Sequence, residues 1–469
     1  MVWKRIIRQL KNFYTTIWDN IEKLKTVLLS LLIVLSIFLT FSLWTFTPNN
    51  NVLENEAPIE TKIPDGRKEK LSNIIQPRQV IIHHNSKHYW SYSTDQNKVY
   101  NQLQSALLIG KDQVEFQENI SSDGIDITYP TGIPVNVLKE TFKFSNETPF
   151  SNYEGNVERL RVYNDEGAWK IQFIFKAEET NEDSDEYMDP VVYQFEISDK
   201  STKALVEMMV TSKNTVEVEE YELDGNSFYL PIEEMKVDTY FYTTSEVDVN
   251  LFVKALLPRD VATRKTDNKI VYAKSKSQIT YHQDSNELTY INLNSQDELS
   301  RQNAIIQSLD WINNHAGWTN TFHLYHYYDS SLDTNTSNQQ KEISYRMIMN
   351  GFPIMDNSIG QISLNWMTNQ ASEYERSLVY LREEFYNDKQ DSPPTVAKGA
   401  DVIRALSELS NANNISDITI GYALKLDPDS QNVGIGNTLY LEPAWYYKIR
   451  SSWLKVDFES IDPIKNEGG

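Results

Sequence analysis

The stretch TVLLSLLIVLSIFLTFSLW, from Thr26 to Trp44, contains no charged side chain. At about 1.5 Å per residue, a helix of this length spans roughly 28 Å, close to the apolar thickness of a bilayer. A single segment satisfies its backbone polar groups in lipid only as a helix. The sequence therefore predicts a transmembrane anchor over residues 26–46. A buried core helix would need apolar partners on all sides.

The charges on the two sides of this stretch differ in sign. The residues before it carry six Lys or Arg against two acidic residues, whereas the first charges after it are Glu54, Glu56 and Glu60. The positive-inside rule places the N-terminus in the cytoplasm and the rest of the chain outside the cell membrane. A cleaved signal peptide is the alternative, but the residues that follow, among them Phe41, Trp44 and Phe46, do not form a small-residue cleavage site.

Residues 1–25 are predicted to form a basic amphipathic segment in the cytoplasm, because their apolar side chains recur at helical spacing. Such a helix could lie on the inner membrane surface, pack on a partner helix or serve only to set the topology. Within the anchor, one helix face carries residues at spacings of three and four. We predict that this face contacts partner helices, since Ser and Thr allow close approach in lipid. Its residues are Leu29, Ile33, Ser36, Thr40 and Trp44.

The part after the anchor is too long for a single core. Three Pro residues among polar ones predict a linker over residues 47–76. We then expect three units: an N-terminal domain over 77–235, a middle α+β domain over 236–300 and a C-terminal α+β domain over 301–469. Short alternating runs predict strands throughout, and helices are expected at 99–109, 249–257, 301–314 and 395–410. The predicted class is α+β with mainly antiparallel sheets and packed helices.

Composition limits the possible functions. The net charge is −22, and the part after the anchor is more acidic still, which argues against binding nucleic acid. The chain has no Cys, which removes thiol chemistry and suggests an exported bacterial protein that does without disulfides.

No motif predicts catalysis, a metal or a cofactor. His323 and His326 lie three apart in a predicted strand and should point to opposite faces, so they should not share a metal. His83, His84 and His88 lack an evident set of three or four ligands. Ser452-Trp-Leu-Lys455 matches the S-x-x-K pattern of cell-wall transpeptidases, but it lies in a predicted terminal strand without the other elements of that site.

Several stretches, in order along nearly the whole chain, resemble the YycH family. The residues that carry the resemblance are Leu35–Pro48, Ile75–His83, Val249–Pro258, Ala316–Trp318, Tyr345–Ile354, Gly421–Tyr422 and Leu441–Tyr446. The C-terminal domain also resembles that of the partner protein YycI. The basic segment 1–25 departs from the family pattern, so its role stays open. We interpret Gly351 and Pro353 as turn residues and Trp318 and Trp445 as core.

The resemblance implies a single-pass membrane protein of low-GC Gram-positive bacteria that performs no reaction. With a YycI-like protein, such a regulator modulates the sensor histidine kinase WalK (YycG) of the WalK/WalR system, which governs cell-wall metabolism. One alternative is an extracytoplasmic sensor that binds a peptide or glycan in a groove between the C-terminal domains. A less favoured one is an anchored cell-wall enzyme.

Overall fold

The structure is a computed structural model of the chain. It describes residues 25, 28–36, 63, 66–92, 94–117, 123–150, 153–176, 189–198, 215–257, 260–293, 303–330, 340–367, 370–385, 394–426 and 438–458. The chain divides into two compact units, residues 1–57 and residues 58–469, and each is described by itself.

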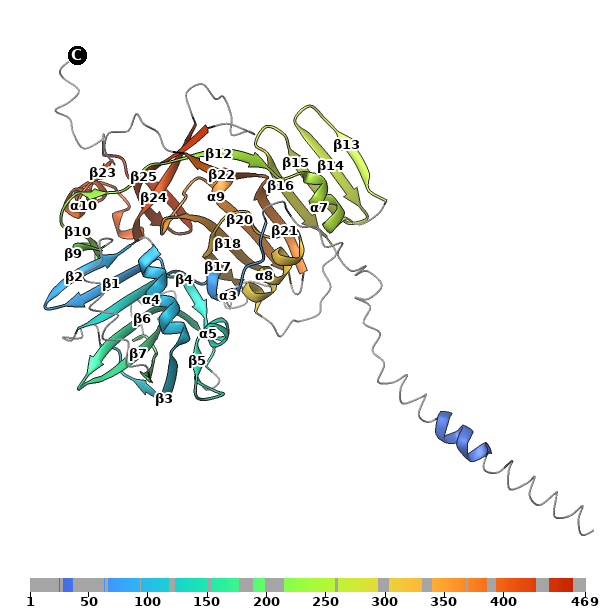
Figure 1. The fold of residues 1–469 in the computed structure, drawn as a ribbon, viewed down its shortest axis with the longest axis horizontal. Helices are drawn as coiled ribbons and strands as arrows, with labels where there is room; N and C mark the ends of the chain where they lie inside the picture. Colours follow the sequence, from blue (N-terminus) through green and yellow to red (C-terminus); the bar gives the residue numbers. More distant parts are fainter. Residues whose placement is uncertain are drawn as a thin grey trace, which may run out of the picture. The chain divides into compact units, whose positions relative to one another are not determined.

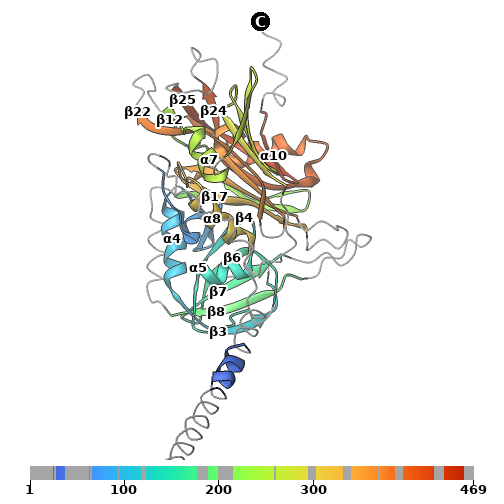
Figure 2. The same ribbon diagram turned by 90° about the vertical axis from the view of Figure 1, so that its right-hand side faces the viewer.

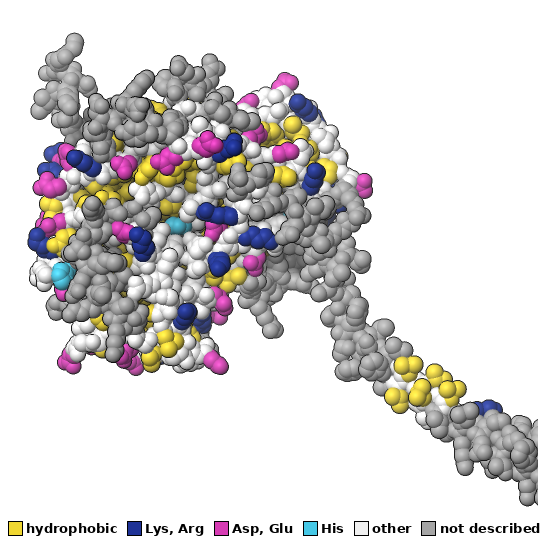
Figure 3. Space-filling model, viewed as in Figure 1, with side chains coloured by type: hydrophobic (Ala, Val, Ile, Leu, Met, Phe, Trp, Pro, Cys, Tyr) yellow, Lys and Arg dark blue, Asp and Glu magenta, His cyan; other side chains and the backbone are white. Residues whose placement is uncertain are grey.

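In the first unit, residues 28–36 are helical, inside the predicted anchor. Apolar side chains between Leu28 and Leu35 are 47–67% exposed, and Figure 3 shows them as a yellow group on this helix. Within the described residues, no helix is both long and apolar enough to cross a membrane. The rest of the stretch 26–46 lies outside the described residues, so the anchor stays a prediction.

The second unit begins its regular structure with the short helix α3 (Leu71–Ile74), and a ten-stranded sheet follows (Figure 1). Alternating apolar residues form its strands, as in the run AWKIQFIF of β7. The order across the sheet is β10-β9-β2-β1-β4-β6-β7-β8-β3-β5, and within it the short β3–β5 pair is parallel. The strands are β1 (Gln79–His84), β2 (Lys87–Ser91), β3 (Leu107–Val114), β4 (Gly124–Pro134), β5 (Lys143–Phe144), β6 (Asn156–Asp165), β7 (Ala168–Phe175), β8 (Val192–Ile197), β9 (Thr215–Leu223) and β10 (Asn226–Pro231).

Helices α4 (Thr94–Ser105) and α5 (Val135–Thr141) lie beside this sheet (Figure 2). The hydroxyl groups of Tyr100 on α4 and Tyr129 on β4 are 2.7 Å apart and buried. The core below them is aromatic, with Phe150 packed edge-to-face against Phe173 and Phe195. Tyr100 packs edge-to-face against Phe142, which packs against Phe173, so this aromatic core contacts α4.

A nine-stranded antiparallel sheet follows, in the order β13-β14-β15-β16-β21-β20-β18-β17, with β19 paired to β18. Helices α7 (Val249–Leu256) and α8 (Ala304–Asn314) cover it: Phe252 of α7 and Trp311 of α8 both contact the Tyr374 ring. The short helix α9 (Asn357–Gly360) precedes β20. The strands are β13 (Ala262–Lys265), β14 (Lys269–Lys274), β15 (Ser277–His282), β16 (Glu287–Asn292), β17 (Phe322–Asp329), β18 (Gln340–Met349), β19 (Phe352–Pro353), β20 (Gln361–Met367) and β21 (Gln370–Ser377).

The third sheet has five strands in the order β22-β12-β25-β24, with β26 paired to β25. Trp445 of β25 is buried and donates its indole N–H to the Ala397 carbonyl oxygen at 2.8 Å. The elements are β12 (Tyr240–Glu246), β22 (Val379–Phe385), β24 (Ile415–Leu426), β25 (Thr438–Ile449), β26 (Ser452–Lys455), helix α10 (Gly399–Ser407), the 3₁₀ turn η2 (Ala412–Asn414) and the strand pair β11 (Met235–Lys236) and β23 (Thr395–Val396).

The mixed α+β class with mainly antiparallel sheets is confirmed, and so is the burial of Trp318 and Trp445. Two helix boundaries differ from prediction because strand pairing takes over residues that also suit a helix. The helix predicted at 99–109 ends at Ser105, and Leu107–Val114 pairs with β8 instead. The helix predicted at 395–410 begins at Gly399, and Thr395–Val396 pairs with β11. The division into units 77–235, 236–300 and 301–469 stays a prediction.

Candidate functional site

Ile63 and residues 66–76, at the end of the predicted linker, lie against the turn between α8 and β17. The Ile63 N–H donates to the Ala316 carbonyl oxygen at 3.3 Å. The backbones of Arg67 and Trp318 each donate to the other at 3.0 Å. This backbone pairing attaches the segment that enters the second unit to a point far along the chain, and we call it the junction.

Asn313, at the end of α8, strengthens the junction with its side chain. Its Oδ1 accepts from the Glu69 backbone N–H at 2.9 Å, and its Nδ2 donates to the Glu69 carbonyl oxygen at 2.9 Å. The same Oδ1 accepts from the indole N–H of Trp318 at 2.9 Å. One amide therefore satisfies two backbone groups and a fully buried Trp.

The turn that receives the segment has an unusual backbone that Arg376 supports. Ala316 and Gly317 have φ values of 77° and 83°. The Arg376 guanidinium, from β21, donates to the Gly317 carbonyl oxygen at 2.9 Å and lies 5.2 Å from the Phe252 ring centroid. Arg376 is only 3% exposed. Its buried guanidinium therefore stabilises the turn through the hydrogen bond to Gly317, while the contact with the Phe252 ring holds the guanidinium in place.

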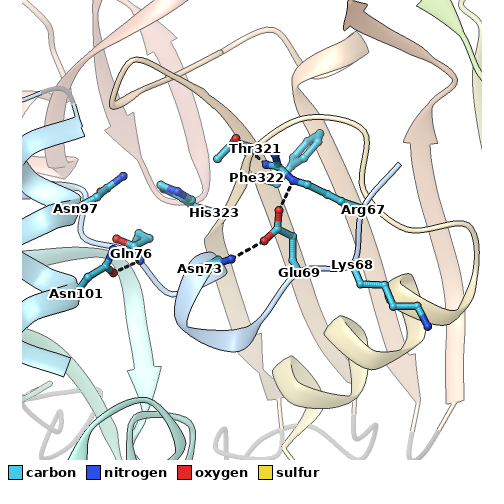
Figure 4. Close-up of a pocket in the computed structure, with 10 residues that line it drawn as sticks. All are labelled: Arg67, Lys68, Glu69, Asn73, Gln76, Asn97, Asn101, Thr321, Phe322 and His323. Carbon is cyan, nitrogen blue, oxygen red and sulfur yellow. Dashed lines mark hydrogen bonds and ion pairs between the residues drawn. The ribbon is translucent and has the colours of Figure 1, made fainter. Parts of the chain in front are cut away.

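A pocket of about 390 Å³ opens beside the junction (Figure 4). Three segments line it: the residues from Arg67 to Gln76, helix α4, and the start of β17. Most of its side chains are amides or other uncharged groups. Its lining consists of Arg67, Lys68, Glu69, Asn73, Gln76, Asn97, Asn101, Thr321, Phe322 and His323.

Two of the three charged groups of the pocket, Arg67 and Glu69, are paired with each other. Arg67 forms an ion pair with Glu69 and donates to the Thr321 hydroxyl at 2.8 Å. Glu69 also accepts from the Asn73 amide at 2.8 Å. Burial lowers the pKa of His323 to about 3, so this imidazole is neutral at physiological pH.

A second contact joins the ten-stranded sheet to the strands that follow it. Arg78, just before β1, pairs with Asp417 of β24, with Nε and Oδ2 at 2.9 Å, and both side chains are largely buried. The Thr131 hydroxyl on β4 donates to the Tyr327 carbonyl oxygen at 3.3 Å and accepts from the Tyr327 N–H at 3.2 Å. These bonds hold β4 against β17.

Burial dominates the electrostatics of this second contact. It raises the pKa of Asp417, although the charges of Arg78 and Lys448 oppose the change. It also lowers the pKa of Lys448, whose ammonium group donates to the Pro130 carbonyl oxygen at 3.3 Å. Removal of one partner of such a buried ion pair strongly destabilises the folded protein, because the other charge is left buried without a partner.

Comparison with known proteins supplies the family. The model of the YycH protein C-terminal domain matches residues 225–462, and that of the N-terminal domain matches residues 22–209. The chain belongs to the YycH family. One relative, from Bacillus subtilis strain 168, is named "Two-component system WalR/WalK regulatory protein YycH"; it is 20% identical over 95% of this chain and 98% of its own length. The crystal structure of YycH from Bacillus subtilis matches with a TM-score of 0.64 and 17% identity, over 85% of this chain and all of that one.

The predicted membrane-contact face is described only in part in this YycH-family chain. Leu29, Ile33 and Ser36 lie in the helix 28–36 and are exposed. Thr40 and Trp44 lie outside the described residues. The contact role of all five residues stays a prediction.

The prediction for His323 and His326 was wrong in its geometry. A bulge at Tyr325 interrupts β17, so that His323 pairs with Arg346 and His326 with Ser344. Because Arg346 and Ser344 lie two residues apart on β18, the two imidazoles share a face rather than pointing to opposite ones. Across the described residues, no three His, Asp or Glu side chains converge as a metal site.

His83 and His88 form a polar cluster on the first hairpin. The Nδ1 atoms of His83 and His88 are 2.7 Å apart, and His83 also lies 3.5 Å from Asp126. Asp126 forms a buried pair with Arg161, with Nε and Oδ1 at 2.9 Å. His84 instead lies beside Asp123, at the end of β1.

Ser452-Trp-Leu-Lys455 forms β26, paired antiparallel to β25, as the sequence predicts. The transpeptidase site would need this Ser at the start of a helix. Gly351 has a φ of 85° in the turn before β19, which agrees with its interpretation as a turn residue, whereas Pro353 lies in β19 itself.

Sequence reasoning missed the junction. The segment 47–76 is rich in Pro and polar residues, which is typical of a linker, and nothing in it marks Arg67 or Glu69 as contact residues. Ala316-Gly-Trp318 was recognised only as part of the family resemblance. One signal was available: a Gly beside the end of a predicted helix indicates a turn with positive φ.

Proposed function

We propose that this chain is a regulator of a two-component system that performs no reaction of its own. The observation that best supports this proposal is that the chain belongs to the YycH family over nearly its whole length. One relative in this family is named as a regulatory protein of WalR/WalK. The absence of a catalytic motif in the sequence is consistent with this proposal. In finer detail, the chain acts with a YycI-like protein on the WalK histidine kinase and thereby influences cell-wall metabolism.

We place the chain in the cell membrane, with residues 26–46 as its single anchor and the larger unit outside. The exposed apolar helix 28–36 supports this placement, because a run of apolar side chains needs an apolar environment. Leu29, Ile33, Ser36, Thr40 and Trp44 then face partner helices. The acidic remainder of the chain is unsuited to nucleic acid.

The junction suggests how the outer unit influences the anchor. Residues 66–76 end the predicted linker from the anchor and are held by hydrogen bonds of Asn313 and Trp318. A regulator shifts a kinase only if it binds one signalling state more tightly than the other. A difference of about 1.4 kcal/mol gives a tenfold bias. A firmly held junction allows the outer unit to restrict the position of the anchor and so supply part of that difference.

The decisive experiment is co-purification from detergent-solubilised membranes. The full-length chain and a fragment of residues 1–46 are each tested for capture of the kinase and of a YycI-like protein. If both capture the kinase, the membrane helix carries the contact. If only the full-length chain does, recognition involves the outer unit. If neither does, the proposed function is wrong.

The ligand-binding alternative is favoured by one observation, the pocket beside the junction. Its position differs from the expected groove between the C-terminal domains, because α4 and the segment from Arg67 to Gln76 form two of its walls. Ligand binding there is compatible with a regulatory role. The enzyme alternative would require loss of turnover on wall fragments in alanine variants of Ser452, Lys455, His323 or His326.

A further inference from the structure

The pocket beside the junction has a size and a lining suited to a small ligand. Its volume of about 390 Å³ falls within the usual range of small-molecule sites, about 300–1,000 Å³. Figure 4 shows side chains from three separate segments converging on it. We propose that this pocket binds an uncharged, hydroxyl-rich ligand, a saccharide.

The inner wall offers hydrogen-bond acceptors that the protein does not use. Gln76 is 4% exposed, and its amide donates to the Ser72 carbonyl oxygen at 2.6 Å and to Asn101 Oδ1 at 3.1 Å. In the described part of the chain, Gln76 Oε1 and Asn97 Oδ1 have no hydrogen-bond partner, although both are shielded from solvent. An unpartnered buried acceptor is costly, and a ligand that brings a donor removes the cost.

The Asn97 amide can adjust to a ligand at little expense, whereas the Gln76 amide is held by its bonds to Ser72 and Asn101. The terminal torsion of Asn is soft, so a small rotation turns the oxygen towards the pocket. Asn97 and Asn101 are one helical turn apart on α4 and line the same wall. Together with Gln76 they present a row of amides, which can accept from and donate to ligand hydroxyl groups.

The charges of the pocket favour a neutral ligand. An anion would set its own acceptor oxygens against those of Gln76 and Asn97. A cation would meet the positive charge of Lys68, which also lines the pocket. The deepest titratable group, His323, is neutral, because burial lowers its pKa to about 3. Arg67 and Glu69 neutralise each other as an ion pair.

The shape of the pocket favours a compact ligand over a peptide. Extended peptides are recognised along a sheet edge or a long groove. Here β17 lies along one wall and is the last strand of its sheet. Its outer edge is not open to a peptide, because Thr131 of β4 bonds to the Tyr327 backbone there. A saccharide has the compact form and the hydroxyl donors that the site requires.

Ligand binding in this pocket would also affect the junction. Glu69 and Asn73 line the pocket, and Glu69 is the residue whose backbone Asn313 holds. A bound ligand would therefore slow the opening of residues 66–76. This inference is separate from the kinase contact, so either can fail without the other.

The test is calorimetric titration of the full-length protein in detergent with N,N′-diacetylchitobiose, an uncharged disaccharide. Tetraglycine and glucuronate are titrated in parallel as a neutral peptide and an anionic sugar. Asn97→Leu removes an acceptor from the wall, and Lys98→Ala is the matched control on the exposed side of the same helix. Asn101→Leu is the second variant, used if Asn97→Leu melts below the wild type.

We expect the disaccharide to bind the wild type and Lys98→Ala equally, and Asn97→Leu or Asn101→Leu about tenfold more weakly, as for one lost hydrogen bond. Hydrogen exchange over residues 66–76 should slow on saturation. The proposal is overturned if the disaccharide gives neither heat nor slower exchange at millimolar concentration, or if both wall variants bind like the wild type. Binding of tetraglycine or glucuronate in place of the disaccharide overturns the ligand class.

Discussion

Gly317 and Arg67 approach so closely that any side chain at position 317 would displace the Arg67 backbone. A Cβ there would lie 2.8 Å from the Arg67 carbonyl oxygen, and the φ of Gly317 is 83°. The close approach and the positive φ both occur at the junction, because Trp318, the residue after Gly317, pairs with the Arg67 backbone. The junction therefore requires a Gly for two reasons, conformation and space.

Gly317→Ala should destabilise the protein by more than conformational strain alone. We expect a loss of about 2–4 kcal/mol in the free energy of unfolding, from positive φ and from displacement of the Arg67 backbone. Gly225→Ala is the control, because Gly225 has a φ of 87° but open space around it, and it should lose only about 1–2 kcal/mol. Urea unfolding measures both. Equal losses would show that the close approach to Arg67 costs nothing.

Asn313→Ala should loosen the segment from Arg67 to Gln76. The substitution removes two hydrogen bonds to Glu69 and one to Trp318, so we expect a loss of about 2–3 kcal/mol. Asn314→Ala, at the exposed next position of α8, should change stability by less than about 0.5 kcal/mol. Hydrogen exchange should become faster over residues 66–76 in the first variant alone. Unchanged exchange there would contradict the role given to Asn313.

The sequence predicted the fold class because its strands alternate and its helices are amphipathic, both of which are local properties. It could not predict the junction, since Arg67 and Trp318 are distant in sequence and each bond joins backbone groups that any residue has. The bulge at Tyr325 was equally hidden, because one extra residue in β17 reverses the faces without changing composition. The buried Arg376 lies in a strand whose pattern gives no sign of the turn it supports.

His323 should make the protein less stable as the pH falls. Its pKa in the folded protein, about 3, lies below the ordinary value of 6.5. The contribution of His323 to the free energy of unfolding is therefore fully present above pH 6.5. It is lost as the pH falls from 6.5 towards 3, because the His323 imidazole takes up a proton in the unfolded chain before it does so in the folded protein. His323→Gln should remove this pH dependence. Over this pH range, the free energy of unfolding of the wild type should therefore fall by about 1.4 kcal/mol per pH unit more than that of the variant.

Urea unfolding of both proteins from pH 7.5 to pH 4.5 checks this expectation. His88, His315 and His326 also have lowered pKa values owing to burial. They remain in both proteins, so their contributions cancel in the difference. Parallel stability curves would show that the His323 imidazole is not held neutral by the fold.

Removal of one partner of the Arg78–Asp417 pair should cost more than removal of both. Arg78→Met leaves the Asp417 carboxyl group buried without its cation, and we expect a loss of about 3–5 kcal/mol. Arg78→Met combined with Asp417→Leu should recover part of that loss. The exposed pair Arg404–Asp401 on α10 is the control, and Arg404→Met should cost less than about 1 kcal/mol. Additive effects in the double variant would contradict a buried, coupled pair.

The predicted membrane face can be tested against the opposite face of the same helix. Ser36→Leu with Thr40→Leu places bulk where close helix approach is proposed, so co-purification with the kinase should weaken severalfold, since contacts of this kind contribute about 0.6 kcal/mol each. Ser42→Leu makes the same chemical change roughly half a helical turn away and should leave capture unchanged. Each variant must be recovered from membranes in wild-type amounts. Equal capture by all variants would remove the assignment of this face, and equal loss would mean that bulk anywhere on the helix disturbs the complex.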